Sequence, residues 1–281
     1  MPSSNKACIV ASFLKLIEID AEEARTCPDA FERLRNGDLQ AIFVHGVYAP
    51  AVMSSVVERL ERHDPPFLQT WFPSKFRSWF FGRNLNLADP GLEGYFAEAA
   101  LFHQHLEALF PPGLGLAARV AGILSDLDGG RAFMAPPGRE TGQHYMFTTL
   151  RAHLEGGYIP VHFDNEQALV PSFAHLRGLV ELHMTSFVLT LQAAEGGGAL
   201  EVYDHCCEPS DAYFIRGIPS AKPEVEGLAS VSFQIPAGAM IVLDSGRYLH
   251  RVAPVQGSRK RWTACSFMAL SRERNAMYCW G

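Results

Sequence analysis

Apolar positions in the first half of the chain recur mainly with the period of an amphipathic helix. Residues 50–63, PAVMSSVVERLERH, place their apolar side chains on one helical face and begin with a proline. Residues 91–110 repeat this pattern more strongly, and residues 115–127 are apolar enough for a buried helix. Residues 11–20 and 40–48 have the composition of strands. The pattern therefore predicts that the first half is mainly helical.

After residue 155 the pattern changes to short, β-rich segments that glycine and proline separate. The segments are YIPVHFD (158–164), SFVLTLQAAEGGGALEVYD (186–204), VSFQIPAGAMIVLDSG (231–246) and HRVAPVQGSRKRWTACSFMAL (250–270). Many short strands at this spacing are typical of a sandwich or jelly roll. We therefore predict a single α+β domain, residues 1–281, with a double-stranded β-helix (jelly-roll) core in 151–281. The helices of residues 1–150 would pack on one side of this core and supply a wall for the substrate.

Composition and charge narrow the classes of partner. The chain has 281 residues, 48% of them hydrophobic, and a net charge of −6 from 24 basic and 30 acidic residues. Its densest basic cluster is SRKR (258–261), so we expect no nucleic acid and no membrane surface as a partner. No signal peptide or spanning segment is recognised, and the six cysteines show no CxxC spacing. These features predict a cytoplasmic protein with reduced thiols. They leave the oligomeric state open, and we expect a monomer or a weak homodimer.

His162 and Asp164 lie two residues apart in a strand-like segment. Side chains at this spacing point to the same face of a strand, where burial would require polar partners or a metal. His250 ends another apolar segment, and Arg259 follows nine residues later. In a jelly roll these strands can meet at one mouth of the barrel. Two imidazoles and one carboxylate would then form the 2-His-1-carboxylate ligand set of non-haem Fe(II).

Two motifs carry a resemblance to a known family. The segments LEGGYIPVHFDNE (154–166) and LDSGRYLHRV (243–252) resemble their counterparts in the Fe(II)/2-oxoglutarate-dependent oxygenases. More narrowly, they are similar to free-standing aliphatic halogenases of hapalindole-type alkaloid biosynthesis and to related hydroxylases of free or N-substituted amino acids. The resemblance extends from about FVHGVY (43–48) to the C-terminal MYCWG. It implies Fe(II) held by His162, Asp164 and His250, with 2-oxoglutarate and O2 as cosubstrates.

Arginine suits the far carboxylate of 2-oxoglutarate, because its planar guanidinium makes paired hydrogen bonds to a carboxylate. Arg251, Arg259 and Arg261 compete for this role. Arg251 follows His250 directly and should point away from the metal, whereas Arg259 and Arg261 have the same strand parity. We predict Arg259, because its GSR spacing resembles the G-x-basic pattern of the family.

One departure from the halogenases bears on the reaction. The resemblance implies that the halogenases have a glycine at the position that corresponds to Asp164. That glycine leaves room for chloride on the metal. A carboxylate here implies hydroxylation of an unactivated C–H bond of a small molecule, with decarboxylation of 2-oxoglutarate to succinate. Desaturation, epimerisation or cyclisation would begin with the same hydrogen abstraction and remain alternatives. A non-catalytic jelly-roll binding protein or a zinc-dependent isomerase are further alternatives.

The substrate is the least constrained part of the prediction. The aromatic segment WFPSKFRSWFFGRN (71–84) is either core between helices and barrel or a wall of the substrate pocket. Candidate substrate contacts are Trp79, Phe81, Arg83, Tyr145 and Asn165. An amino-acid derivative or an alkaloid-like natural product would fit such a pocket. The histidines other than His162 and His250 are expected to be mostly structural.

Overall fold

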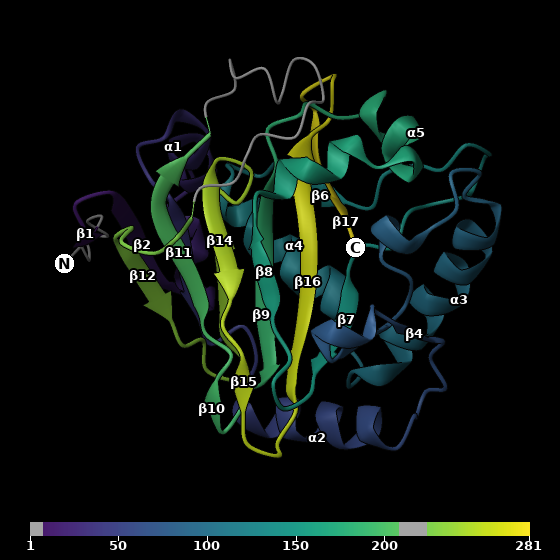
Figure 1. Cartoon of the computed structure of the whole chain (residues 1–281). Helices are drawn as coiled ribbons and strands as arrows, with labels where there is room; N and C mark the ends of the chain where they lie inside the picture. The colour runs from purple at the N-terminus through teal and green to yellow at the C-terminus, as the bar shows by residue number, and fades with distance from the viewer. Residues whose placement is uncertain (1–7, 208–223) are drawn as a thin grey trace.

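Two β-sheets face each other, and helices cover the outer side of the larger one (Figure 1). The computed structural model describes residues 8–207 and 224–281. Its helices are α1 (Ala30–Asn36), α2 (Pro50–Glu61), α3 (Glu93–Leu109), α4 (Leu116–Leu127) and α5 (Ala174–Arg177). Short 3-10 helices are η1 (Ala21–Thr26), η2 (Ser74–Phe76), η3 (Leu85–Leu87), η4 (Asp164–Leu169) and η5 (Pro171–Phe173).

The larger sheet joins strands from both halves of the chain. In spatial order it contains β1 (Cys8–Ala11), β2 (Leu14–Asp20), β3 (Ala41–His45), β13 (Met240–Leu243), β9 (Thr185–Gln192), β16 (Arg261–Leu270), β7 (Thr149–His153), β5 (Ser78–Phe81) and β4 (Gln69–Trp71). Strand β17 (Ala276–Trp280) pairs with β16 and with β6 (Ala132–Met134). Because β13, β9, β16 and β7 lie side by side, segments far apart in the sequence share one inner face.

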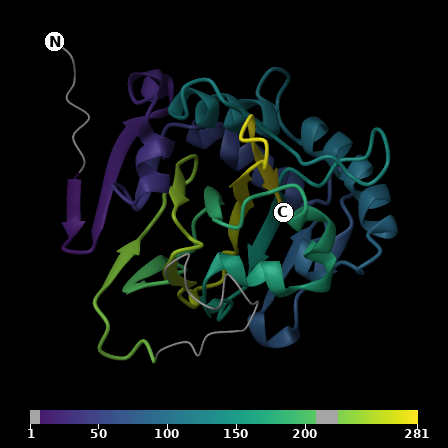
Figure 2. The same ribbon diagram turned by 90° about the horizontal axis from the view of Figure 1, so that it is seen from above.

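The smaller sheet carries the two histidine-bearing strands. Its order is β12 (Ser230–Phe233), β11 (Leu200–Cys206), β14 (Tyr248–Val252) and β8 (Ile159–His162). A two-stranded ribbon of β10 (Gly196–Gly197) and β15 (Val255–Gln256) adjoins it in the chain. The view from above shows the N-terminal strands at one side of the molecule and the helices α3 and α4 at another (Figure 2).

Alternate residues of the larger sheet face either the helices or the space between the two sheets. On β16, Trp262 and Ala264 face the helices and join a large apolar cluster with residues of α1 to α4. Between the sheets, the side near β2, β3 and β13 is apolar, with Phe43, Ile241 and Val202 in one cluster. Buried polar groups take the inner face of β7, β9 and β16 instead. The inner face therefore changes from apolar to polar toward the side where β8 and β14 lie.

The jelly-roll core with helices on one side confirms the predicted fold class. Helices α2, α3 and α4 match the predicted segments 50–63, 91–110 and 115–127. Strands β2 and β3 match the predicted strands at 11–20 and 40–48, whereas β1, β4, β5 and β6 were not predicted. The sequence hides β5, because all four of its residues are buried and three of them in a row are aromatic, so polar and apolar positions do not alternate.

Two expectations drawn from composition can be compared with the described residues. Among these residues no helix has the length and apolarity needed to cross a membrane. The five cysteines whose side chains are described, at positions 27, 206, 207, 265 and 279, form no disulfide.

Candidate metal centre

His162, Asp164 and His250 converge between the ends of two paired strands. His250 of β14 lies opposite His162 of β8 in the antiparallel register, and Asp164 is the first residue of η4. Nε2 of His162 lies 3.3 Å from Oδ1 of Asp164, and Nε2 of His250 lies 3.6 Å from the same oxygen. One potential ligand atom from each of the three lies within 4.8 Å of the other two. The structure thus brings together the three residues that the spacing had singled out.

Both imidazoles are oriented by their own strands. Nδ1 of His162 lies 2.7 Å from the carbonyl oxygen of Pro160, and Nδ1 of His250 lies 2.9 Å from that of Tyr248. Because a carbonyl only accepts, we assign the proton of each neutral ring to Nδ1. The lone pair of each Nε2 is then directed at the space beside Asp164. This is the arrangement that fixes a histidine as a metal ligand.

The charges of the cluster favour a cation. Asp164 is only 3% exposed; burial raises its pKa, but His250 and His162 lower it by more, to well below its usual range. Burial lowers the pKa of His250, while the Asp164 carboxylate raises it by more. Two imidazole nitrogens and one ionised carboxylate form a donor set that suits Fe(II). The residues present therefore fit the metal that the sequence motifs imply.

A tight turn between β13 and β14 holds the cluster from behind. The Asp164 N–H donates to the carbonyl oxygen of Ser245 at 3.0 Å. The side-chain amide of Asn165 donates to the carbonyl of Gly246 and accepts from the N–H of Met184, both at 3.0 Å. Asn165 is 2% exposed, so its polar atoms are committed to the backbone. The prediction that Asn165 contacts substrate is therefore wrong, and its contacts place it in support of Asp164.

The same turn is fixed by a buried acid. Asp244 is fully buried, and its Oδ1 lies 2.8 Å from Nε2 of His183. Nε of Arg247 lies 3.4 Å from its Oδ2. The Asp244 N–H donates to the carbonyl of Gln40 on the approach to β3. The turn is thus tied to both β3 and the segment before β9.

The structure corrects the predicted cosubstrate anchor. Arg259 is exposed, and its guanidinium donates to the carbonyl of Ala194 at 3.1 Å. It lies in the turn before β16, so the strand parity that was applied to it does not hold there. Arg261 is the first residue of β16, is 5% exposed and takes the inner face. It lines a small cavity of about 10 Å³ together with Thr190, whose hydroxyl has no hydrogen-bond partner among the described residues.

Four predicted substrate contacts lie elsewhere. Trp79 and Phe81 face the helices, where the ring of Trp79 lies 4.8 Å from that of Trp262. The guanidinium of Arg83 donates to both carboxylate oxygens of Glu98 on α3, at 2.8 and 2.6 Å.

Tyr145 is fully buried, and its hydroxyl lies 2.9 Å from Nδ1 of His175. For Trp79, Phe81, Arg83 and Tyr145 the predictions are therefore wrong. Packing of the helical layer explains their positions.

Sequence reasoning missed the polar residues of β7. Arg151 and His153 alternate with Leu150 and Ala152, which join the helix-side cluster. The guanidinium carbon of Arg151 lies 4.8 Å from the ring centroid of Phe80, the residue of β5 that faces inward between Trp79 and Phe81. The alternation of polar and apolar residues is visible in the sequence TLRAH of β7. It indicates an inward-facing polar pair only once the strand is known to be buried.

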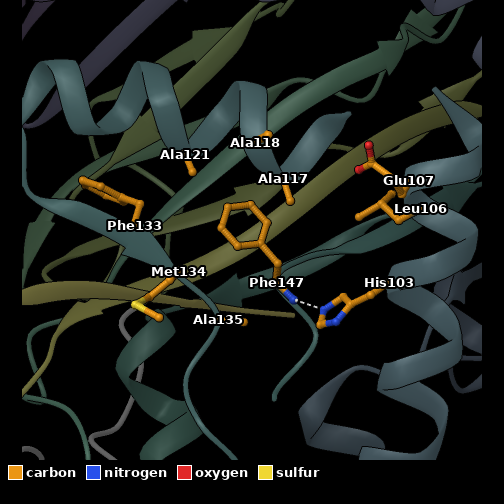
Figure 3. A pocket seen from close by; sticks show the side chains of 10 residues that line it. All are labelled: His103, Leu106, Glu107, Ala117, Ala118, Ala121, Phe133, Met134, Ala135 and Phe147. Atoms are coloured by element: carbon orange, nitrogen blue, oxygen red, sulfur yellow. Dashed lines mark hydrogen bonds between the residues drawn. The ribbon is translucent and has the colours of Figure 1, made fainter. Parts of the chain in front are cut away.

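A second cavity, of about 360 Å³, lies in the helical layer (Figure 3). Residues of α3, α4 and β6 line it together with Phe147, whose N–H donates to Nε2 of His103 at 3.2 Å. Its apolar members other than Ala118 and Met134 belong to the helix-side cluster. The larger sheet therefore separates this cavity from His162 and His250, which lie on the smaller sheet.

Comparisons with known proteins agree with the geometry. The model of the carrier-protein-independent halogenase family WelO5 matches residues 13–281. Because the match spans nearly the whole chain, the protein belongs to this family, whose members use Fe(II) and 2-oxoglutarate. No curated protein sequence matches the chain.

Among solved structures, an N-substituted L-amino acid dioxygenase from Burkholderia ambifaria AMMD, solved in complex with alpha-KG, is similar in fold. Its TM-score is 0.52 at 13% identity, over 90% of this chain and 91% of that chain. A second structure of that dioxygenase gives 0.52 and 14% over the same shares. A prolyl hydroxylase from Trichoplax adhaerens has a TM-score of 0.49 at 11% identity, over 90% of this chain and 93% of that chain.

Proposed function

We propose that this member of the WelO5 family hydroxylates an unactivated C–H bond of a small molecule, with Fe(II) held by His162, Asp164 and His250. The observation that supports it is the Asp164 carboxylate, whose Oδ1 lies within 3.6 Å of both Nε2 atoms. The resemblance gives the halogenases a glycine at this position, which leaves space for a halide. A carboxylate on the metal occupies that space and favours hydroxylation over halogenation.

Each residue of the site has a defined task. His162 and His250 present their Nε2 lone pairs, because backbone carbonyls hold both Nδ1 protons. Asp164 supplies the negative charge, and its burial keeps water from competing for the same position. Bound Fe(II), with 2-oxoglutarate and O2, supplies the oxidising power that removes the hydrogen atom and yields succinate and CO2.

Arg261 replaces Arg259 as the proposed anchor of 2-oxoglutarate. Its guanidinium enters the barrel from β16, is buried, and has no ion pair among the described residues. Thr190 lies beside it with an unused hydroxyl. A carboxylate at this position would satisfy both groups at once.

An anaerobic titration tests the metal ligands. Fe(II) and 2-oxoglutarate added to the protein should give a weak visible charge-transfer band. Loss of a residue that only supports a metal ligand weakens metal binding about 10 to 100 times, so the Asp164→Ala variant, which loses a ligand, should bind Fe(II) at least that much more weakly and form correspondingly less succinate in air. Asp204→Ala, which removes an exposed carboxylate on β11, is the matched control. Undiminished succinate formation by Asp164→Ala would refute the ligand assignment.

The product identifies the reaction. The dioxygenase from Burkholderia ambifaria acts on N-substituted L-amino acids, so these compounds are suitable first substrates together with indole alkaloids. Mass spectrometry should show the addition of one oxygen atom in the presence of chloride or bromide. A halogenated product would favour the reaction named by the family model, and a loss of two hydrogens would favour desaturation or cyclisation.

The setting of the protein stays a prediction. A small-molecule substrate, a cytoplasmic location and a monomer or weak homodimer are consistent with the proposal. Sedimentation analysis of the purified chain would measure the oligomeric state directly.

A further inference from the structure

Arg151 is a buried cation that the proposed metal and cosubstrate sites do not use. It lies on the inner face of β7, opposite Thr263 of β16 and Phe80 of β5. The residue is 8% exposed. Its guanidinium donates one hydrogen bond, to the hydroxyl of Ser78 at 3.2 Å, and its Nε has no partner among the described residues. Burial lowers the pKa of Arg151 to about 10, so the group remains charged at neutral pH.

The barrel interior therefore holds two buried guanidiniums, those of Arg151 and Arg261. Within residues 8–207 and 224–281, neither forms an ion pair with an acid. His153 lies two residues after Arg151 on β7 and directly opposite Arg261 of β16. It is fully buried, with no partner for either ring nitrogen in the same part of the chain. Burial, Arg151 and Arg261 all lower its pKa, so it is a neutral ring with one N–H to donate. The three polar side chains thus lie on one face of the neighbouring strands β7 and β16.

Charge balance indicates that two anions bind here. Unpaired buried charges are strongly unfavourable, so each guanidinium requires an anion when the site is filled. The cosubstrate offers only one carboxylate away from the metal, because its other carboxylate lies beside the keto group that binds Fe(II). Arg261, next to Thr190, takes the first anion. Arg151 is left for a second one.

The residues around Arg151 indicate the chemistry of the rest of the second ligand. The guanidinium carbon lies 4.8 and 5.2 Å from the ring centroids of Phe80 and Phe72. The rings of Phe76 and Tyr158 lie 5.5 Å apart nearby, and both are half-buried. Aromatic rings beside a guanidinium suit a carboxylate that is attached to an apolar body.

We propose that the substrate is a carboxylic acid with an apolar substituent, and that its carboxylate binds to Arg151 while 2-oxoglutarate binds to Arg261. This inference rests on the proposed oxygenase function and specifies its substrate class. The neutral N–H of His153 completes the polar surface between the two anions.

Matched ligands and variants test the inference by binding. The probes are N-acetyl-L-phenylalanine, N-acetyl-L-leucine and indole-3-acetic acid, each compared with its methyl ester. They are added without O2 to the protein loaded with Fe(II) and 2-oxoglutarate, and the shift of the charge-transfer band is recorded. At least one acid should bind, and its ester should bind about tenfold more weakly. Equal binding of acids and esters, or binding by none of the acids, would overturn the inference.

The variants separate the two anion sites. Arg151→Met should weaken binding of the acid about tenfold or more, and change the Kd of 2-oxoglutarate by less than about threefold. Arg261→Met should show the reverse order, and Arg259→Met should change neither, because Arg259 is exposed. If Arg151→Met weakens 2-oxoglutarate binding as much as Arg261→Met does, Arg151 is a second cosubstrate anchor and the inference is wrong.

Two controls complete the design. If Arg151→Met fails to fold, Arg151→Lys keeps the charge but loses the planar pair of donors, and it must still weaken binding of the acid. Absence of the charge-transfer band in the unaltered protein would refute the proposed function itself. That result differs from a normal band that no acid perturbs, which refutes the substrate class alone.

Discussion

Single residues at the start of a strand decide which side chains enter the barrel. Arg259 and Arg261 differ by two positions, yet one is at the surface and the other is 5% exposed. The reason is that β16 begins at Arg261, and alternation applies only from there. The choice of Arg261 rather than Arg259 as the 2-oxoglutarate anchor therefore follows from where β16 begins. The sequence alone defines such a strand boundary poorly.

The first prediction compares these two arginines in turnover. Arg261→Met should raise the KM for 2-oxoglutarate about tenfold to a hundredfold, since a charge-assisted pair to a carboxylate is lost. Arg259→Met should leave the KM unchanged. Succinate formation at varied 2-oxoglutarate concentrations gives both values. A larger effect at Arg259 than at Arg261 would contradict the assignment.

Asn165 allows a second test at the residue scale. Asn165→Asp keeps an acceptor for the Met184 N–H but loses the donor to the Gly246 carbonyl, and it places a second carboxylate beside Asp164. The free energy of unfolding should fall by about 1–3 kcal/mol. Urea denaturation of the metal-free protein measures this change. Asn86→Asp, at an exposed position, should have little effect.

At the scale of elements, the turn of residues 244–248 connects the metal ligands to the sheet. Its backbone carbonyls hold the Asp164 N–H, the Asn165 amide and the His250 ring. Its first residue, Asp244, in turn holds His183 and Arg247. The geometry of the site therefore depends on a buried acid that points away from the metal.

The third prediction concerns this acid. Asp244→Ala leaves His183 and Arg247 without their partner and should lower the free energy of unfolding by about 3–5 kcal/mol. Affinity for Fe(II) should fall as well, because the turn no longer fixes His250. Asp244→Asn, which keeps an acceptor for His183, should recover part of both losses. Urea denaturation and Fe(II) titration provide the measurements, and unchanged Fe(II) affinity in Asp244→Ala would separate the turn from the site.

Strand alternation also explains how far the sequence could predict the site. The placement of His162, Asp164 and His250 near one another was predictable, because a two-residue spacing fixes a shared face and the motifs fix the strands. Trp79 and Phe81 were misplaced, because SWFF is buried on both sides and its letters do not reveal which face meets the helices. The inward residues of that strand are Ser78 and Phe80, which the same alternation would have identified once the orientation was known.

At the scale of the whole molecule, the space between the two sheets is divided by polarity. Apolar side chains fill it on the side of β2, β3 and β13, whereas Arg151, His153 and Arg261 lie on the other side. The apolar part holds the sheets together. Burial of the polar part is unfavourable when no ligand is bound. These buried polar groups therefore lower the stability of the metal-free protein.

This division predicts how the stability of the metal-free protein depends on pH. Burial first, and then Arg151 and Arg261, lower the pKa of His153 well below its ordinary value of 6.5. The unfolded chain therefore binds a proton below that pH while the folded chain does not, and His153 costs stability as the pH falls. The cost approaches about 1.4 kcal/mol for each pH unit below about 6.5.

His250 has the opposite sign, because its pKa is raised in the folded protein. Its contribution is complete below the unfolded pKa of about 6.5 and is lost as the pH rises through the folded pKa. The His250 contribution therefore changes above about pH 6.5 and the His153 contribution below it, and the two overlap around that pH. A variant that removes one titration separates them.

His153→Gln removes the titrating ring and keeps a polar side chain. Between about pH 7.5 and 5.5, its free energy of unfolding should fall by about 1 kcal/mol less than that of the unaltered protein. Urea denaturation of the metal-free proteins at several pH values measures the difference, and His144→Gln, at an exposed position, serves as the control. Parallel profiles for His153→Gln and the unaltered protein would mean that His153 is protonated inside the barrel, and the charge of the anion-binding surface would then be greater than the two guanidiniums supply.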